Sequence, residues 1–355
     1  MLPGLIESHA HLFLEGAELD FEKRKAYLKQ SPTMLLAKAI LRLEKLLKLG
    51  ITAYRDAGDK DGVGIALSKL YRSPSHPAMP YVESPGPAIH HRGRYGSFMA
   101  EPIEDHAHPA SVVEHRIKLG ADRIKLIPTG IINFKKGLVT AKPQMDAQEV
   151  KAFTEAAKER GKQTFAHASG SDGIQNAIDG GVDSVEHGFF ITDEQLARMR
   201  DLDIAWTPTF APVQVQVDEA ERMGWDQTVV SHLRRILESH SRSLAKAQAR
   251  GVKIVAGSDA GSCGVGHGTH FLSELELMEQ AGLSPLQVIN SATGVPASRL
   301  GFSERFGSLT AGCKPRFILT EHDPLACVSQ LRLPKITHFD GREFVGSESD
   351  DISGL

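Results

Sequence analysis

Cysteine is scarce in this sequence, and net charge is almost absent. The three cysteines, Cys263, Cys313 and Cys327, are an odd number at irregular spacing, which favours free thiols over a disulfide framework or a cysteine-based zinc site. The 41 Lys and Arg residues nearly balance the 44 Asp and Glu residues, for a formal net charge of −3. A chain with this balance of charge has no net electrostatic attraction to nucleic acid or to an anionic membrane. We therefore expect a small-molecule substrate as the partner.

Long apolar runs are missing too. No stretch approaches the roughly 18 residues that span a bilayer, and residues 1–30 carry charged and histidine side chains rather than an apolar stretch that ends in a cleavage site. The sequence therefore predicts a cytoplasmic protein without a signal peptide. With 41% apolar and 24% charged residues, the chain can build a sizeable core, and its unusual feature is the count of 16 histidines.

A repeated order of helix, turn and strand runs through most of the chain. Amphipathic segments end at a glycine or a turn and are followed at once by an apolar run, as where LLKLG precedes ITAYRDAG. Eight strands are expected in this way, at 4–12, 51–58, 78–86, 123–130, 163–170, 184–188, 203–212 and 253–261. Helical periodicity lies between them, for example at 34–49, 150–160 and 229–249. The pattern predicts an α/β fold, a (β/α)8 TIM barrel, with an open doubly wound sheet as the alternative.

The pattern changes after a helical stretch at 284–299. The segments FGSLTAG, RFILTE and ITHFDGREFV are typical of short strands, and Asp340-Gly341 within the last is a strong hairpin signal. We therefore predict a barrel at 1–301, a short C-terminal β appendage at 302–346 and a flexible tail at 347–355.

Polar residues interrupt the predicted strands near their carboxyl ends, the face of a barrel that carries the active site. They are His9, His11, Lys125, His167, His187 and Asp259. His9 and His11 are two apart on an extended segment, so both side chains project to one face and can grip one metal ion. A single buried histidine is more often a core residue, but four on one rim indicate a shared role. Asp259 is interpreted as a ligand that also takes a proton, with a helix N-cap as the alternative.

Lys125, within RIKLI, would place an ammonium inside the barrel, where it needs a partner or must lose its charge. Three interpretations compete. The side chain reaches the rim, or it forms a Schiff base with a carbonyl substrate, or its neutral amine adds CO2 to become a carbamate that bridges two metals. The histidine cluster favours the carbamate, because its anionic oxygens suit hard or borderline cations.

Taken together, these residues resemble the amidohydrolase superfamily, from about Leu2 to Val345, in its imidazolonepropionase-like and Xaa-dipeptidase (prolidase-like) branch. The motifs that carry the resemblance are LPGLIESHAHL, GITAYRDAG, GADRIKLIPTG, FAHASG, GVDSVEHG, WTPTFAP, VAGSDAG and SATGVPASRLG. Glu7 replaces the commoner acidic residue of the first motif. The resemblance implies two divalent metal ions, with zinc as the expected metal. By that resemblance His9, His11 and Asp259 would hold one metal, His167 and His187 the second, with carboxylated Lys125 bridging them.

The activity that the resemblance implies is hydrolysis of an amide C–N bond in a dipeptide or an N-acyl amino acid. Two cations sharing a water would lower its pKa and generate hydroxide near neutral pH, and Asp259 would act as general base and then general acid toward the leaving amine. The alternative is hydrolysis of a cyclic amide, lactone or phosphoester on the same binuclear centre. A Schiff-base lyase that uses Lys125 and a non-catalytic binding relative are two further hypotheses.

Substrate contacts are expected from the loop after the third strand and from the last barrel loop. The candidates are His91, Arg92, Arg94, Tyr95 and His267. Arg92 or Arg94 is suited to pair with a substrate carboxylate, with a solvated basic loop as the alternative. The chain has GRYG and PTGIINF where dipeptidases of the branch are expected to have Gly-Gly-His and Gly-Gly patterns, which argues against ordinary dipeptide specificity. Arg55 is expected to form a structural ion pair near the rim.

Relatives are expected to build a β-sandwich from both chain ends, yet the first-strand motif here begins at Leu2. We therefore predict a reduced appendage that lacks its N-terminal half. Its strand edges would be covered by the barrel or by a partner subunit, which leaves a homo-oligomer open.

Overall fold

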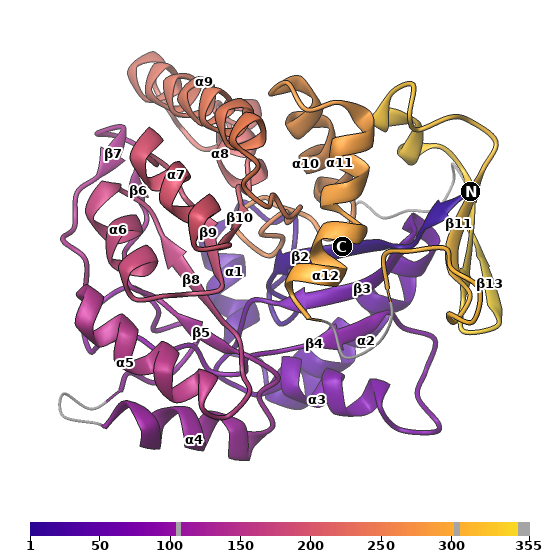
Figure 1. Cartoon of the computed structure of the whole chain (residues 1–355), viewed down its shortest axis with the longest axis horizontal. Helices are drawn as coiled ribbons and strands as arrows, with labels where there is room; N and C mark the ends of the chain where they lie inside the picture. Colours follow the sequence, from indigo (N-terminus) through magenta and orange to yellow (C-terminus); the bar gives the residue numbers. More distant parts are fainter. Residues whose placement is uncertain (104–107, 302–305, 347–355) are drawn as a thin grey trace.

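The computed structural model describes residues 1–103, 108–301 and 306–346 (Figure 1). Two parallel sheets form its centre. The first contains β2 (Leu5–Ala10), β3 (Ile51–Asp56) and β4 (Tyr81–Glu83), and the second contains β5 (Ile124–Leu126), β8 (Thr164–Ala168), β9 (Ser184–His187) and β10 (Ala205–Thr207). Every residue of these strands is buried, as expected of parallel strands covered on both faces.

Parallel bridges join the two sheets to each other. Ile89, after β4, bridges to Leu126 of β5, and Trp206 of β10 bridges to Ile254. The segment at 253–261 then returns to β2 through the bridge between Ala10 and Ala260. The result is a TIM-barrel-like α/β arrangement. Seven of the eight expected strands are regular strands, whereas the eighth makes only isolated bridges. Near its end the backbone is not extended, since Asp259 and Gly261 have φ of 55° and 94°.

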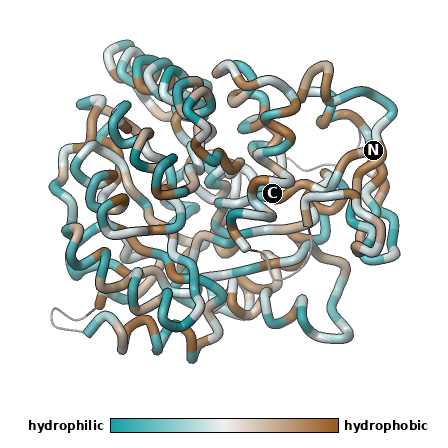
Figure 2. Tube along the Cα trace, in the orientation of Figure 1, coloured by the Kyte–Doolittle hydropathy of each residue, from teal (hydrophilic) through white to brown (hydrophobic). Residues whose placement is uncertain are grey.

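Helices surround the parallel strands (Figure 1). They are α1 (Phe21–Leu28), α2 (Pro32–Leu46) with η1 (Leu47–Leu49), α3 (Val63–Tyr71), α4 (Pro109–Leu119), α5 (Ala147–Lys158), α6 (Ser171–Asp179), α7 (Asp193–Asp201), α8 (Ala211–Asp218), α9 (Gln227–Arg250), α10 (Thr269–Gln280), α11 (Pro285–Ser291) and α12 (Gly294–Arg299). The helices expected at 34–49, 150–160 and 229–249 are confirmed as α2 with η1, α5 and α9, whereas the stretch at 284–299 is divided into α11 and α12. In α9 hydrophilic and hydrophobic residues alternate (Figure 2), because one face packs inward.

A third sheet, which is antiparallel, lies at one end of the molecule in the order β1-β11-β12-β13. Its strands are β1 (Leu2–Pro3), β11 (Arg316–Thr320), β12 (Lys335–Phe339) and β13 (Arg342–Val345), with the short helix η2 (Val328–Arg332) between β11 and β12. The predicted hairpin is confirmed: Asp340 and Gly341, with φ of 49° and 84°, connect β12 to β13.

Two expectations for this region differ from the structure, and a third falls on residues that it does not describe. Leu2 pairs with Ile318 of β11 rather than within the first barrel strand, so the N-terminus does contribute a strand to this sheet. FGSLTAG, at 306–312, is not a strand, since Gly307 and Gly312 have φ of 71° and 86° and turn the chain. The predicted tail at 347–355 and residues 302–305 lie outside the described residues.

The three cysteines are free thiols, as expected. Within the described residues, no helix combines the length and the apolar character that crossing a bilayer requires.

Candidate metal centre and active site

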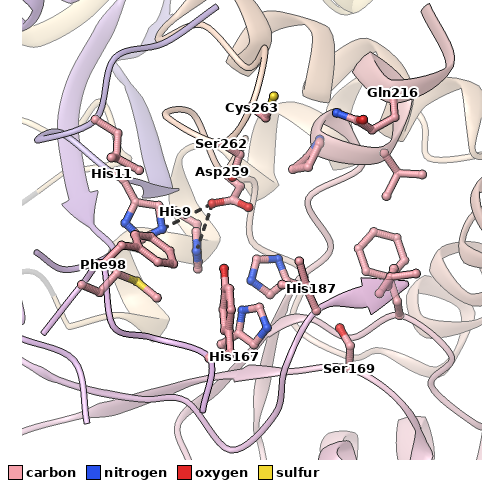
Figure 3. Close-up of a pocket in the computed structure, with 18 of the residues that line it drawn as sticks. His9, His11, Phe98, His167, Ser169, His187, Gln216, Asp259, Ser262 and Cys263 are labelled. Carbon is pink, nitrogen blue, oxygen red and sulfur yellow. Dashed lines mark ion pairs between the residues drawn. The ribbon is translucent and has the colours of Figure 1, made fainter. Parts of the chain in front are cut away.

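The six residues singled out as metal ligands line one cavity of about 360 Å³. They are His9 and His11 at the end of β2, Lys125 in β5, His167 in β8, His187 at the end of β9, and Asp259 in the segment that follows α9. Figure 3 shows the four imidazoles and the Asp259 carboxylate turned toward the same space. The carboxyl ends of neighbouring parallel strands meet at one edge, which explains why residues up to 250 positions apart converge here.

His9, His11 and Asp259 form the tightest group in the cavity. One potential ligand atom from each lies within 4.8 Å of the others. The Asp259 Oδ1 atom is 3.7 Å from His9 Nε2 and 3.5 Å from His11 Nε2. The backbone holds the carboxylate there, since the Asp259 N–H donates to the His9 carbonyl at 2.6 Å. Asp259 also has φ of 55°, a conformation that is costly for a residue other than glycine and is concentrated at functional sites.

In His9 and in His11, one ring nitrogen forms a hydrogen bond with a neighbouring group. His9 Nδ1 lies 2.5 Å from Glu186 Oε2, and His11 Nδ1 lies 3.1 Å from the Gly58 carbonyl. Both partners accept, so both Nδ1 atoms carry the proton and both Nε2 lone pairs remain available. His9 Nε2 is buried and has no hydrogen-bond partner among the described residues. An unpaired buried nitrogen of this kind fits a metal ligand.

His167 and His187 form the other half of the cluster, with ring centroids 4.5 Å apart. His167 Nε2 is 3.3 Å from the Gly130 carbonyl, and His187 Nδ1 is 2.8 Å from Thr209 Oγ1. Each ring again keeps one nitrogen for a ligand. His187 and Thr209 have φ of 66° and 53°, so strained backbone occurs on this side of the cavity as well.

Burial sets the protonation state of this cluster. It lowers the pKa of His9 and His187 well below the usual value and the pKa of His11 and His167 to about 3. All four rings are therefore neutral near pH 7 and can donate lone pairs. Burial also lowers the pKa of Lys125 to about 8, which increases the fraction of neutral amine. Its Nζ lies 4.6 Å from the centroid of the Phe165 ring.

Glu186 is the functional residue that the sequence analysis missed. Its Oε2 atom accepts from His9 and lies 2.9 Å from Arg55 Nη2, while Ser184 Oγ donates to Oε1 at 2.5 Å. The ion pair expected for Arg55 is thereby confirmed. The available signal was an acidic residue inside a wholly buried strand, because such a carboxylate must have a partner.

Tyr95 is the candidate substrate contact that does line the cavity, and its ring centroid lies 5.0 Å from that of His167. The other four candidates are not among the residues that line it. His91 Nε2 is 2.6 Å from Glu149 Oε1, Arg94 Nη2 donates to the Lys142 carbonyl at 2.5 Å, and Arg92 is exposed.

His267 also differs from expectation. It is fully buried, 2.9 Å from the Tyr54 hydroxyl and 3.1 Å from the Leu14 carbonyl. Both ring nitrogens therefore have protein partners. Its hydrogen bonds connect Tyr54 of β3 to the loop after β2, and it is not among the residues that line the cavity.

Comparisons with known proteins show which family this chain is similar to. The sequence model of the Amidohydrolase family matches residues 1–347. An ochratoxinase of Aspergillus niger is 24% identical over 369 residues, covering 95% of this chain and 74% of that protein. An uncharacterized protein of Mycobacterium tuberculosis is 25% identical over 293 residues, covering 82% of this chain and 72% of that protein. The crystal structure of a Xaa-Pro dipeptidase with bound methionine has a TM-score of 0.81 and 27% identity, covering 97% of this chain and 86% of that chain.

Proposed function

The chain belongs to the amidohydrolase family, in its prolidase-like branch, and we propose that it is a binuclear metal-dependent hydrolase that cleaves an amide C–N bond. One observation carries this proposal: the buried, unpartnered Nε2 of His9 faces the Asp259 carboxylate, with His11 on its other side. Burying a nitrogen lone pair without a partner costs folding free energy, and a cation bound to that nitrogen would remove the cost.

We infer that the six residues hold two divalent cations, zinc being the first candidate. His9, His11 and Asp259 would hold one, His167 and His187 the other, and a carbamate formed from the Lys125 amine and CO2 would bridge them. The free ring nitrogen on each histidine and the burial of Lys125 support this division. Such cations, when bound, lower the pKa of a water and polarise a substrate carbonyl.

Asp259 is assigned the proton transfer. It is the one carboxylate among the cavity-lining residues of the described chain. It would take a proton from the attacking water and pass it to the leaving nitrogen, so that the products are a carboxylic acid and an amine. Its carboxylate lies between His9 Nε2 and His11 Nε2, and its backbone is held by the hydrogen bond from the Asp259 N–H to the His9 carbonyl.

The scissile bond is proposed to be an amide because the Xaa-Pro dipeptidase in the comparison is named for cleaving one. We also infer that the parallel segments close into a complete eight-stranded barrel, which the bridges at Ile89, Ile254 and Ala260 support.

Metal analysis combined with hydrolysis assays tests the function. The purified protein should contain two divalent ions per chain and should release amine from N-acyl amino acids, amides or dipeptides. Chelation should abolish the activity, and added metal should restore it. A metal-replete protein that cleaves no amide but opens lactones or cleaves phosphoesters would contradict the proposed reaction.

A further inference from the structure

The cavity above the candidate metal centre has a wall that is largely apolar. Its lining includes Leu14, Phe98, Met99, Phe134, Phe189 and Val213. They come from the loops that follow β2, β4 and β9, from the hairpin of β6 (Ile132–Asn133) and β7 (Leu138–Val139), and from α8. A volume of about 360 Å³ lies within the range of about 300 to 1,000 Å³ that is usual for pockets binding small organic molecules.

The rim of the cavity is apolar and exposed. Phe21 of α1 is 61% exposed and Ile131, just before β6, is 54% exposed, and both line the cavity. A ligand that covers such side chains gains about 25 cal/mol of binding free energy for each Å² of apolar surface removed from water. These two residues are placed to cover the outer part of an apolar ligand.

The cationic side chain nearest this wall is already surrounded by backbone carbonyls. Beyond Lys125 and the histidines, Arg24 is the one cationic residue that lines the cavity in the described chain. Its Nη2 donates to the Gly261 carbonyl at 2.7 Å, and its Nη1 lies within 3.2 to 3.5 Å of the carbonyls of Glu15, Glu18 and Ser262. The guanidinium is therefore used to tie α1 to the loop after Asp259. A carboxylate bound against the apolar wall, away from Arg24 and from the candidate metal centre, would lose its water without gaining an ion pair.

Neutral polar groups are present instead. Gln216 of α8 is buried and lines the cavity, and its Oε1 accepts from Trp225 Nε1 at 3.0 Å. That bond fixes the carboxamide orientation and leaves its NH2 end as a donor. Ser169 adds a hydroxyl to the lining. Donors of this kind suit an uncharged carbonyl or ether oxygen.

We propose that the substrate is an uncharged amide with bulky apolar or aromatic groups on both sides of the scissile bond and without a free carboxylate or ammonium beside it. This inference rests on the proposed hydrolase function, because it takes the amide bond as given. It departs from dipeptides and N-acyl amino acids, whose carboxylate would meet the apolar wall.

A matched pair of compounds tests the proposal. N-phenethylbenzamide and N-benzoylphenylalanine differ only in the α-carboxylate. Their ketone analogues, in which a methylene replaces the amide N–H, cannot be hydrolysed. Calorimetric titration of the metal-replete protein with the two ketones should show about tenfold tighter binding of the neutral compound. Equal or tighter binding of the acid would overturn the inference.

A gain of charge at the rim provides the second readout. Ile131→Arg should improve binding of the acid ketone by about tenfold and weaken binding of the neutral ketone. Leu286→Arg, on the distant helix α11 and 56% exposed, is the matched control and should change neither. If Ile131→Arg leaves both affinities unchanged, the rim does not contact the ligand and the inference is wrong.

Hydrolysis of the two amides separates this inference from the proposed function. Cleavage of the acid in preference to the neutral amide would overturn the inference while upholding the function. Tight binding of the neutral ketone without cleavage of any amide would support the substrate class and contradict the reaction.

Discussion

His9 Nδ1 lies 2.5 Å from Oε2 of Glu186, and neither side chain is more than 1% exposed. This contact fixes the tautomer of His9 and directs its Nε2 toward Asp259. Glu186→Gln should therefore lower metal affinity by about 10- to 100-fold, the usual effect of losing such a supporting partner. Competition with a chromophoric chelator measures the affinity, and circular dichroism checks the fold.

A second His–Glu pair in the same chain is the control for that experiment. His91 Nε2 lies 2.6 Å from Glu149 Oε1, outside the cavity lining. Glu149→Gln should leave metal affinity unchanged. Equal losses in both variants would mean that the effect is general destabilisation rather than support of His9.

The buried Arg55–Glu186 pair is expected to matter for stability as well. Removing one partner of a buried pair leaves an uncompensated charge, at a typical cost of 3–5 kcal/mol, so Arg55→Met should lower the free energy of unfolding by about that amount. The exposed pair of Arg198 and Asp179, at 2.7 Å, is the comparison, and Arg198→Met should cost at most about 1 kcal/mol. Urea denaturation measures both, and equal effects would contradict the role of burial.

Lys125→Ala is expected to reduce the metal content and abolish hydrolysis, because the proposed bridging carbamate would be lost with the amine. Short-chain carboxylic acids should partly restore both by supplying a carboxylate in its place. Lys335 in β12 is a suitable comparison, since it too is buried with a pKa lowered to about 8 by burial. Lys335→Met should retain the metals, and metal retention by Lys125→Ala would exclude the bridge.

Glu274 of α10 should make stability depend on pH. Burial raises its pKa from 4.5 to about 8, and its carboxylate oxygens accept from the Phe210 and Ala211 N–H groups at the start of α8. The folded chain holds this proton where the unfolded chain releases it, so the stabilisation is complete below the unfolded pKa and is lost as the pH rises through the folded pKa.

The test compares wild type with Glu274→Gln across that window. The free energy of unfolding of wild type, relative to the variant, should fall with rising pH by at most about 1.4 kcal/mol per unit. A difference that does not vary with pH would show that Glu274 does not titrate between the two values.

Short-range sequence patterns alone predicted the positions of most strands of this protein. The glycine-bounded apolar runs predicted the positions of seven regular strands, since a helix that ends at a left-handed glycine and an apolar run after it are both short-range features. The two-residue spacing of His9 and His11 predicted their common direction for the same reason. The loops were less predictable: Arg94 and His91 turn away from the cavity to partners about 50 to 60 residues later in the chain.

By itself, the sequence determined the order of strands and helices and which polar residues stand at the strand ends, because these depend on neighbours in the chain. Only the tertiary structure decided that Glu186 holds His9, that Leu2 pairs with Ile318, and that Arg24 is used by backbone carbonyls. The pairs His9–Glu186, Arg24–Gly261 and Leu2–Ile318 are separated by about 180 to more than 300 positions in the sequence. Such pairings are set by how strands register and how loops cover the core, which no local spacing encodes.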